Sequence, residues 1–200
     1  MKILNLYAGI GGNRKLWGDE HEITAVEYDP QIAAIYQDFF PNDTVIVTDA
    51  HQYLLDHFKE FDFIWASPPC PSHSRIRKAA THQNPPIFPD LKLYEEILFL
   101  EGYFNGKWVV ENVIPWYKPL IPAKEMHRHL FWTNFQMTMF VGDGDRKHAN
   151  IKSDSTIYGY NLSKYKISGG YNKVKILRNM VDPQLGLHIF KEAFTKTTLF

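Results

Sequence analysis

The stretch that decides the fold is Ile3-Leu4-Asn5-Leu6-Tyr7-Ala8-Gly9-Ile10-Gly11-Gly12. An apolar run that ends in a glycine-rich turn is typical of a first β-strand followed by a nucleotide-binding loop, because glycine adopts positive φ and lets a ligand approach the backbone closely. A helix start after such a loop offers free amides to negative ligand groups. A dinucleotide fingerprint needs a third glycine at position 14, where this chain has Arg14. The pattern disfavours a pyrophosphate-binding dehydrogenase and leaves another nucleotide-type site or a purely structural turn.

Acidic residues end the second and third predicted strands. Glu27 stands where a carboxylate accepts hydrogen bonds from both ribose hydroxyls, and Asp49 where one accepts from an exocyclic amine. Tyr28 is placed to lie against an adenine ring. These residues suit an adenosine ligand without phosphates and point to S-adenosylmethionine.

Short apolar runs alternate with helical patterns over the first two thirds of the chain. We expect strands over 3–7, 23–27, 44–47, 61–66 and 108–110, and helices over 30–39, 50–58 and 91–104. Further along we expect a strand pair over 130–135 and 137–141 and a closing helix over 181–194. The polar, proline-containing stretch 70–90 is predicted to be a loop. Strands separated by helices indicate an α/β fold with a mostly parallel sheet and helices on both faces.

The composition is that of a folded domain. The chain has 200 residues, of which 44% are hydrophobic and 22% charged, and this excludes wholesale disorder. A single cysteine excludes an internal disulfide and a zinc site built from several thiolates. No apolar run is long enough to span a bilayer, and the first residues do not resemble a signal peptide. We therefore expect a cytoplasmic protein.

The zero net charge is a sum of unlike parts. Residues 1–140 hold 12 Lys and Arg against 17 Asp and Glu, whereas residues 141–178 hold eight basic residues against three acidic ones. A basic segment beside an acidic body reopens the question of a nucleic-acid partner. We predict a catalytic and cofactor-binding core over 1–140, a basic minimal target-recognition segment over 141–178, and a C-terminal helix over 179–200 that returns to the core.

Cys70, the only thiol, lies in Ser67-Pro68-Pro69-Cys70-Pro71-Ser72 after the fourth predicted strand. Ligands bind at this edge of open α/β sheets. Most lone cysteines are small core residues, but here prolines stiffen the backbone on both sides. Arg75, Arg77 and Lys78 follow, and their charges would favour a thiolate. The context indicates a nucleophile.

Glu111 ends the fifth predicted strand, so its carboxylate shares the cleft with Cys70. Carbon 5 of cytosine is too poor a nucleophile to take a methyl group from a sulfonium unaided. A thiolate that adds at carbon 6 activates carbon 5, and a protonated Glu111 with a raised pKa would stabilise that addition at ring nitrogen 3. A base then removes the carbon-5 proton and the cysteine is expelled. The nucleotide must first be flipped out of a duplex.

With these motifs in order, the chain closely resembles the DNA cytosine carbon-5 methyltransferase family, in particular the short versions often carried by phages and prophages. The motifs are the glycine loop, Pro68-Pro69-Cys70, Glu111-Asn112-Val113 and Arg178-Asn179-Met180-Val181. The resemblance implies a Rossmann-like S-adenosylmethionine-dependent methyltransferase fold and DNA (cytosine-5-)-methyltransferase activity, in some relatives as part of restriction-modification. It implies catalytic roles for Cys70, Glu111 and Arg128. The cofactor-binding residues that it implies are Tyr7, Ala8, Gly9, Gly11, Gly12, Glu27, Tyr28, Asp49, Ala50, Pro68, Asn179 and Val181.

The chain departs from the family pattern at three places. The family's arginine motif, usually Gln-x-Arg-x-Arg, is His127-Arg128-His129 here. Arg128 is the implied counterpart, but strand alternation would instead select the two histidines. Pro71 stands where the family usually has Gln. The separate target-recognition domain of full-length relatives is reduced to residues 141–178.

The partner predicted from this resemblance is double-stranded DNA. The residues predicted to contact it are Ser72, Arg75, Arg77, Lys78, Arg146, Lys147, Lys164, Lys166 and Lys173. Phosphate contacts position a protein without specifying a sequence, so we expect short or loose recognition, or help from a homodimer or recognition partner. The alternative without a binding function is that the basic segment is a solvated linker. The nine histidines show no metal spacing, and we expect no metal and no membrane association.

Two other functions stay open from the sequence. The same chemistry would serve RNA cytosine or a free pyrimidine nucleotide, because the recognition segment is so short. A catalytically silent DNA-binding regulatory subunit would keep the fold, although such a subunit need not keep Cys70 and Glu111.

Overall fold

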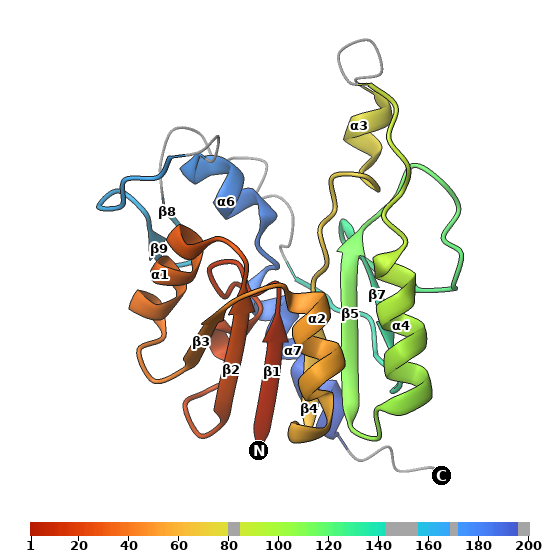
Figure 1. The fold of residues 1–200 in the computed structure, drawn as a ribbon, viewed down its shortest axis with the longest axis horizontal. Coiled ribbons are helices and arrows are strands. Elements are labelled where there is room, and N and C mark those ends of the chain that lie inside the picture. The colour runs from red at the N-terminus through yellow and green to blue at the C-terminus, as the bar shows by residue number, and fades with distance from the viewer. Residues whose placement is uncertain (80–84, 143–155, 169–171, 196–200) are drawn as a thin grey trace.

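A seven-stranded sheet runs through the computed structural model, which describes residues 1–79, 85–142, 156–168 and 172–195 (Figure 1). Its strands are β1 (Lys2–Leu6), β2 (Glu22–Glu27), β3 (Thr44–Val47), β4 (Phe63–Ala66), β5 (Lys107–Val113), β6 (Lys124–Met126) and β7 (His129–Thr133). The strand order is β3-β2-β1-β4-β5-β7-β6. The first five strands pair in parallel, and β7 is antiparallel to both β5 and β6. This arrangement confirms the predicted α/β fold with a mostly parallel sheet.

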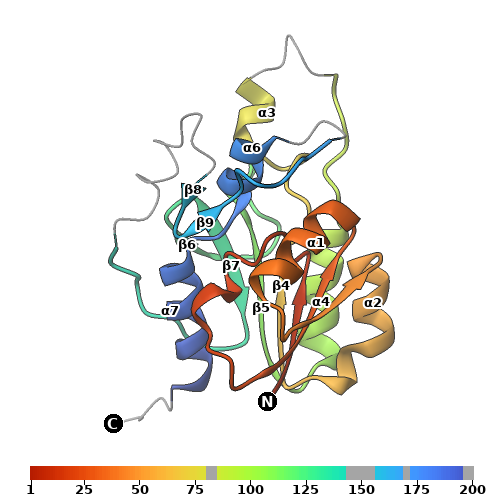
Figure 2. The same cartoon turned by 90° about the vertical axis from the view of Figure 1, so that its left-hand side faces the viewer.

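Helices cover both faces of the sheet (Figures 1 and 2). They are α1 (Pro30–Phe39), α2 (Ala50–His57), α4 (Lys92–Tyr103), α6 (Lys173–Asn179) and α7 (Pro183–Phe194), with short 3-10 turns at Arg14–Leu16 and Phe58–Glu60. One core cluster joins α2 and α4 to the sheet, and two others join α7, α1 and α6 to the opposite face. None of the described helices is long and apolar enough to cross a membrane.

Aspartate caps set the points at which the chain enters three of these helices. Asp29 accepts hydrogen bonds from the amides of Gln31 (2.7 Å) and Ile32 (3.3 Å) at the start of α1. Asp49 and Asp182 cap α2 and α7 in the same way. Because each cap satisfies amides that the first helical turn leaves unpaired, the predicted starts of α1 and α2 agree with the structure.

The segment after β7 differs from the prediction. Residues 137–141 form no strand, because the free edge of β7 is already taken by β6. The Lys124 ammonium donates to the Met137 carbonyl, the Met137 side chain is buried, and the Thr138 hydroxyl donates to Glu192 of α7 at 2.6 Å. This segment therefore packs against α7 instead of widening the sheet.

Two helices form where none was predicted. Residues Arg75–Ala79 form the short helix α3 within the predicted loop. Helix α6 begins within the basic segment 141–178, which shows no strong periodicity of apolar residues. The Asn172 side chain caps α6 by accepting from the Lys175 amide at 2.7 Å. Short helices of this kind bury few residues, so they leave little apolar pattern in the sequence.

Part of the basic segment belongs to the core. A two-stranded ribbon, β8 (Thr156–Ile157) with β9 (Tyr160–Asn161), lies beside α1. Tyr160 and Leu162 are fully buried, and the Tyr160 hydroxyl donates to the Gly11 carbonyl at 2.7 Å. These residues are therefore packed against the glycine loop, unlike a solvated linker.

A buried ion pair explains why Arg14 replaces the third glycine of a dinucleotide loop. Its Nε and Nη2 donate to the two oxygens of Asp43 at 2.9 and 3.0 Å, and both side chains are only 3% exposed. The Tyr36 hydroxyl donates to the same carboxylate at 2.7 Å. The arginine thus ties the turn after the glycine loop to the end of α1.

Replacing Asp43 with Asn should destabilise the protein by about 3 to 5 kcal/mol, because it removes the only counter-charge that is buried with the guanidinium in the described residues. Asp19 also contacts Arg14, at 3.3 Å, but it is 83% exposed, so Asp19→Asn should cost less than about 1 kcal/mol. Urea unfolding of both variants measures the difference. Equal losses in the free energy of unfolding would show that the Arg14–Asp43 pair does not stabilise the fold more than the exposed Arg14–Asp19 contact.

Candidate active site

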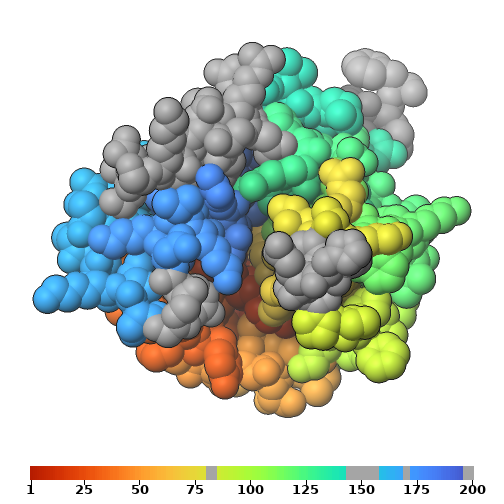
Figure 3. Space-filling model, turned by 90° about the horizontal axis from the view of Figure 1, so that it is seen from above, coloured from red at the N-terminus to blue at the C-terminus, as the bar shows by residue number. Residues whose placement is uncertain are grey.

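The predicted site residues gather beyond the carboxyl ends of the parallel strands, where α3 and α6 also lie (Figure 1). Seen from above, the surface is hollowed between α6 and the segment that carries α3, with the amino-terminal part of the chain at the bottom of the hollow (Figure 3). Parallel strands place all their carboxyl ends at one edge, which is where ligands bind in open α/β sheets.

The loop after β1 is open at one of its glycines. Gly9 has φ +55°, and a Cβ atom at this position would meet nothing within 4 Å. Tyr7 also has positive φ, which is uncommon for a residue with a side chain. The Gly9 amide donates to Glu27 Oε2 at 2.9 Å. The open backbone at Gly9 is the place in this loop that a ligand could approach closely.

The other two glycines of the loop pack against the protein itself. A Cβ atom on Gly11 would collide with the rings of Phe40 and Tyr36, and one on Gly12 would lie 2.6 Å from the Val181 carbonyl and 2.8 Å from the Met180 Cβ. The Gly11 amide already donates to the Ala8 carbonyl at 2.9 Å. The structure explains both glycines, predicted as cofactor residues, by close packing.

Glu27 is held at the end of β2 with both oxygens in use. Oε1 accepts from the Asp29 amide at 3.0 Å, and Oε2 accepts from Gly9. Burial raises the pKa of Glu27, against the opposing effect of these two donors. Each carboxylate oxygen keeps a further lone pair, so the group is oriented and still able to accept hydrogen bonds from a ribose.

The residues predicted for the adenine side lie around the starts of two helices. Tyr28 is 76% exposed, Asp49 is exposed at the cap of α2, and Ala50 and Pro68 are buried. A cavity of about 90 Å³ lies beside Asp49 and Pro68 and is also lined by Tyr7. An oriented acid beside a cavity, with an exposed aromatic ring before the neighbouring helix α1, suits a planar base.

Two polar residues linked to Tyr7, namely Glu96 and His51, were not predicted. The Tyr7 hydroxyl donates to Glu96 Oε1, which also contacts His51 Nδ1 at 2.9 Å. Glu96 is buried, and its hydrogen bond raises the pKa of His51. The apolar spacing of α4 suggests only core residues, and Tyr7 in place of the family's usual Phe is the single sequence signal of this cluster.

Cys70 and Glu111 are brought together by the neighbouring strands β4 and β5. The Asn112 side chain donates to the Pro68 carbonyl at 2.9 Å and so ties the end of β5 to the cysteine loop. Glu111 is 6% exposed and Cys70 is partly exposed. The two motifs, 41 residues apart in the sequence, therefore form one site.

The charges around Cys70 differ from the expectation. Burial and the negative charge of Glu111 raise the pKa of the thiol, whereas Arg128 and Lys175 act in the opposite direction. The expected thiolate-favouring residues, Arg75 and its neighbours on α3, are not among the charges that act on it. Lys175 on α6 was not predicted, because nothing in its local sequence indicates that α6 faces the cysteine.

Of the three candidates in the arginine motif, His129 contacts Glu111. Its Nδ1 is hydrogen-bonded to Glu111 Oε1, and its Nε2 accepts from Arg128 Nε at 3.1 Å. Arg128 also donates to the carbonyls of Arg178 and Met180. His127 has positive φ and lies beside the Phe140 ring. The catalytic role of Arg128 stays a prediction, and in this structure Arg128 contacts His129 and the two carbonyls, while His129 is the member of the motif that reaches Glu111.

The predicted DNA-contacting residues divide into three groups. Ser72 is buried, where its hydroxyl accepts from the Asp90 amide at 3.0 Å, so the structure places it inside the loop. The residues exposed or half-buried on α3 and from Lys164 to the start of α6 are Arg75, Arg77, Lys78, Lys164, Lys166 and Lys173. Arg146 and Lys147 lie outside the described residues.

Several of these cations have partners within the chain. The Lys164 ammonium is 2.6 Å from Asp38, and Lys173 donates to the Ser163 carbonyl at 2.8 Å. Lys78 lies over the ring of Trp116, and Arg77 donates to the Pro85 carbonyl. These contacts attach the four basic side chains to other parts of the chain.

The two C-terminal cofactor candidates lie at different depths. Asn179 is the exposed last residue of α6, and Val181 is buried against the glycine loop. No group of three or more His, Cys, Asp or Glu in the described part of the chain is placed to hold a metal ion.

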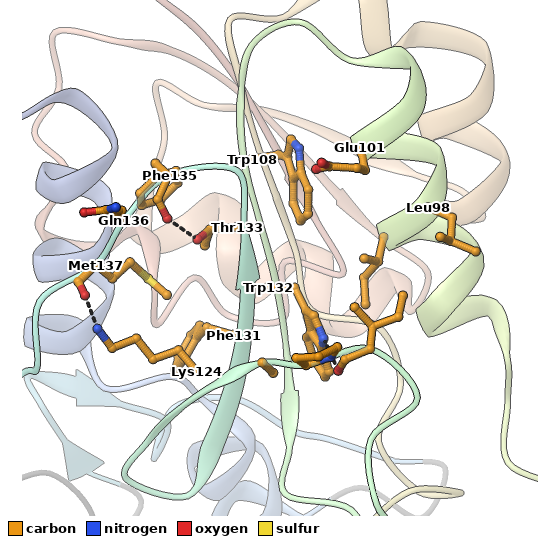
Figure 4. A pocket seen from close by; sticks show the side chains of 14 residues that line it. Leu98, Glu101, Trp108, Lys124, Phe131, Trp132, Thr133, Phe135, Gln136 and Met137 are labelled. Atoms are coloured by element: carbon orange, nitrogen blue, oxygen red, sulfur yellow. Dashed lines mark hydrogen bonds between the residues drawn. The ribbon is translucent and has the colours of Figure 1, made fainter.

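A larger cavity, of about 700 Å³, contains none of the predicted site residues (Figure 4). It lies between α4, the start of β5 and the segment after β7, where Leu98, Trp108, Phe135 and Met137 line it. It is therefore separate from the strand ends that carry Cys70 and Glu111.

The pH dependence of Cys70 alkylation tests this electrostatic environment directly, because the chain has one cysteine. A raised pKa means that less thiolate is present at neutral pH, so alkylation by iodoacetamide should reach half its maximal rate above the pH of an ordinary thiol. Lys175→Gln removes a stabilising cation and should move that midpoint higher. Lys166→Gln, at an exposed position of the same segment, is the matched control. A midpoint lowered by Lys175→Gln would contradict the assignment.

One family model matches the amino-terminal part of the chain. Residues 1–91 match the sequence model of the C-5 cytosine-specific DNA methylases. No curated protein matches the chain. A mutant of Spodoptera frugiperda DNMT2 is 28% identical, with a TM-score of 0.42, over 56% of this chain and 35% of its own. A putative DNA modification methyltransferase from an E. coli prophage is 17% identical, with a TM-score of 0.41, over 59% of this chain and 33% of its own.

A hypothetical protein from Thermus thermophilus is 16% identical, with a TM-score of 0.46, over 66% of this chain and 73% of its own. The chain thus spans about a third of the length of the DNMT2 and prophage structures. The match to the family model includes the glycine loop, Glu27, Asp49 and Cys70, and it ends before Glu111. The resemblance to the C-5 cytosine-specific DNA methylase family is therefore confirmed over residues 1–91.

Proposed function

We propose that the chain is a DNA (cytosine-5-)-methyltransferase that uses S-adenosylmethionine and a covalent adduct through Cys70. The observation that carries this proposal is the pairing of Cys70 with Glu111 at adjacent strand ends, tied together by the Asn112–Pro68 hydrogen bond. The family match over residues 1–91 supports the same chemistry. A lone buried cysteine with a purely structural role would need no buried carboxylate beside it.

The residues around the glycine loop fit S-adenosylmethionine, which supplies an electrophilic methyl group when bound. The open backbone at Gly9 leaves room for the ligand, and Glu27 is oriented to accept from the ribose. In this proposal the exposed Asp49 would accept from the adenine amine, and the exposed Tyr28 ring would cover the adenine. Asn179 lies at the end of α6, on the opposite side of the hollow from α3.

In this proposal Cys70 is the nucleophile and Glu111 is the acid that acts on the base. After losing its proton, the Cys70 sulfur adds to carbon 6, and Glu111 donates a hydrogen bond or proton to ring nitrogen 3. This makes carbon 5 electron-rich enough to be methylated. Loss of the carbon-5 proton to a base then restores the ring double bond and expels the Cys70 thiolate. The raised pKa of Cys70 means that its proton must be removed before or during attack.

The DNA substrate is proposed from the cations around the hollow. The helices α3 and α6 lie on opposite sides of it (Figure 3). Helix α3 carries the exposed Arg75 and Lys78, and α6 carries the exposed Lys175 and Arg178. Cationic side chains on both walls suit the two phosphate backbones of a duplex, and they position it without reading its sequence. Recognition would then be short or loose, or completed by a partner subunit.

A duplex that contains 5-fluorocytosine should form a covalent adduct with the wild-type protein in the presence of S-adenosylmethionine. Fluorine at carbon 5 cannot leave as a proton does, so the Cys70–carbon 6 bond is trapped. Denaturing electrophoresis and mass spectrometry detect the adduct, and Cys70→Ser should abolish it. RNA and free nucleotide carrying the same base are run in parallel.

An adduct only on RNA or on the nucleotide would overturn the DNA assignment. An adduct that survives in Cys70→Ser, or none on any substrate, would overturn the covalent mechanism and leave the silent regulatory subunit as the better interpretation.

Glu111→Gln should lower turnover by about 10²- to 10⁴-fold, because the amide cannot donate an acidic proton. The affinity for S-adenosylmethionine, measured by calorimetry, should not change, since Glu111 lies outside the glycine loop. Glu125→Gln, at an exposed glutamate on β6, is the control and should leave both quantities unchanged. Equal losses of turnover and cofactor affinity in Glu111→Gln would place Glu111 outside the base-binding site.

A further inference from the structure

The geometry points to His129 as a positioning residue that decides which oxygen of Glu111 serves the base. It would hold Oε1 with its Nδ1–H group and so reserve Oε2 for proton donation to the cytosine ring. This inference rests on the proposed function, and it assigns the role to the neighbour of Arg128, the implied counterpart of the family's arginine motif.

The contact comes from the register of two antiparallel strands. His129 on β7 pairs with Val113 of β5, and Glu111 pairs with Phe131. His129 and Glu111 are therefore diagonal neighbours on one face of the sheet, within reach of each other's side chains. Their exposed fractions are 5% and 6%, so water competes little for this hydrogen bond.

Arg128 settles the tautomer of His129. A guanidinium nitrogen donates and cannot accept, so the 3.1 Å contact from Arg128 Nε places a lone pair on His129 Nε2. The proton of the neutral ring must then be on Nδ1, and it is donated to Glu111 Oε1. Arg128 is itself held by the carbonyls of Arg178 and Met180.

The tautomer in turn orients the acid. Since Oε1 accepts the hydrogen bond from His129, a proton carried by Glu111 in its acidic form lies on the other oxygen, Oε2. Oε2 makes no hydrogen bond to the residues that the structure describes. Glu111 therefore presents its acidic proton on the side away from His129. Without the imidazole, the carboxyl group could turn and carry the proton on either oxygen.

Two replacements of His129 test the roles of its two ring nitrogens separately. In His129→Asn the amide nitrogen replaces Nδ1 and keeps the donor to Glu111, whereas in His129→Gln the amide replaces Nε2 and keeps only the Arg128 contact. We expect His129→Gln to lower kcat by about 100-fold, as for a misplaced catalytic group, with the KM for S-adenosylmethionine unchanged. His129→Asn should lose only about fivefold, the effect of one neutral hydrogen bond.

The control is His127→Asn, two residues away, where positive φ suits asparagine; it should keep wild-type kcat and KM. Equal kcat losses in His129→Asn and His129→Gln, or a loss in KM instead of kcat, would overturn the positioning role.

Nitrogen-15 NMR of the wild-type protein, with the His129 ring signals assigned by through-bond correlation to its own backbone, decides the tautomer without any turnover. A protonated Nδ1 and an unprotonated Nε2 would support the inference, and the reverse pattern would overturn it even if the variants fail to fold. A wild-type protein with the expected tautomer but no activity on any cytosine substrate would instead overturn the proposed function, and with it the role of Oε2 in catalysis.

Discussion

The close approach of residues 180–186 to the loop after β1 is the contact on which the site depends. A Cβ on Gly12 would lie 2.6 Å from the Val181 carbonyl, and one on Gly186 would lie 2.6 Å from the Asn13 carbonyl. Two backbone segments can approach each other this closely only where the residue between them has no Cβ atom. The Trp17 indole completes the contact by donating to the Gly186 carbonyl at 3.3 Å.

This contact fixes the position of α6 beyond the carboxyl ends of the parallel strands (Figure 1). Arg128 donates to the carbonyls of Arg178, in the last turn of α6, and of Met180, which follows α6. Arg128 also donates to His129, and His129 in turn contacts Glu111. Lys175 on the same helix acts on the Cys70 thiol. Polar groups linked in series in a poorly hydrated site orient one another, so a residue near the C-terminus helps to arrange groups that are far earlier in the chain.

The proximity of Cys70 and Glu111 was predictable from the sequence, because the carboxyl ends of neighbouring parallel strands lie at the same edge of a sheet. Apolar runs located β4 and β5, and in a parallel sheet both strands end at one edge, so Cys70 and Glu111 had to share a cleft. The same reasoning located Glu27 and Asp49. The choice between Arg128 and His129 was not predictable, because it depends on how β7 pairs with β5, and a shift of one residue reverses the face of every side chain.

By itself, the sequence determined the α/β fold, the acids at the strand ends and the identity of the only thiol. These follow from local periodicity and from counting, which need no knowledge of distant contacts. Only the tertiary structure decided that Gly11 and Gly12 are packing positions, that Ser72 is inside its loop, and that Arg128 and Lys175, instead of the cations on α3, favour the Cys70 thiolate. Burial and electrostatic interactions act through space, and residues 58 and 105 positions after Cys70 in the chain come to surround it only when the sheet and α6 have assembled.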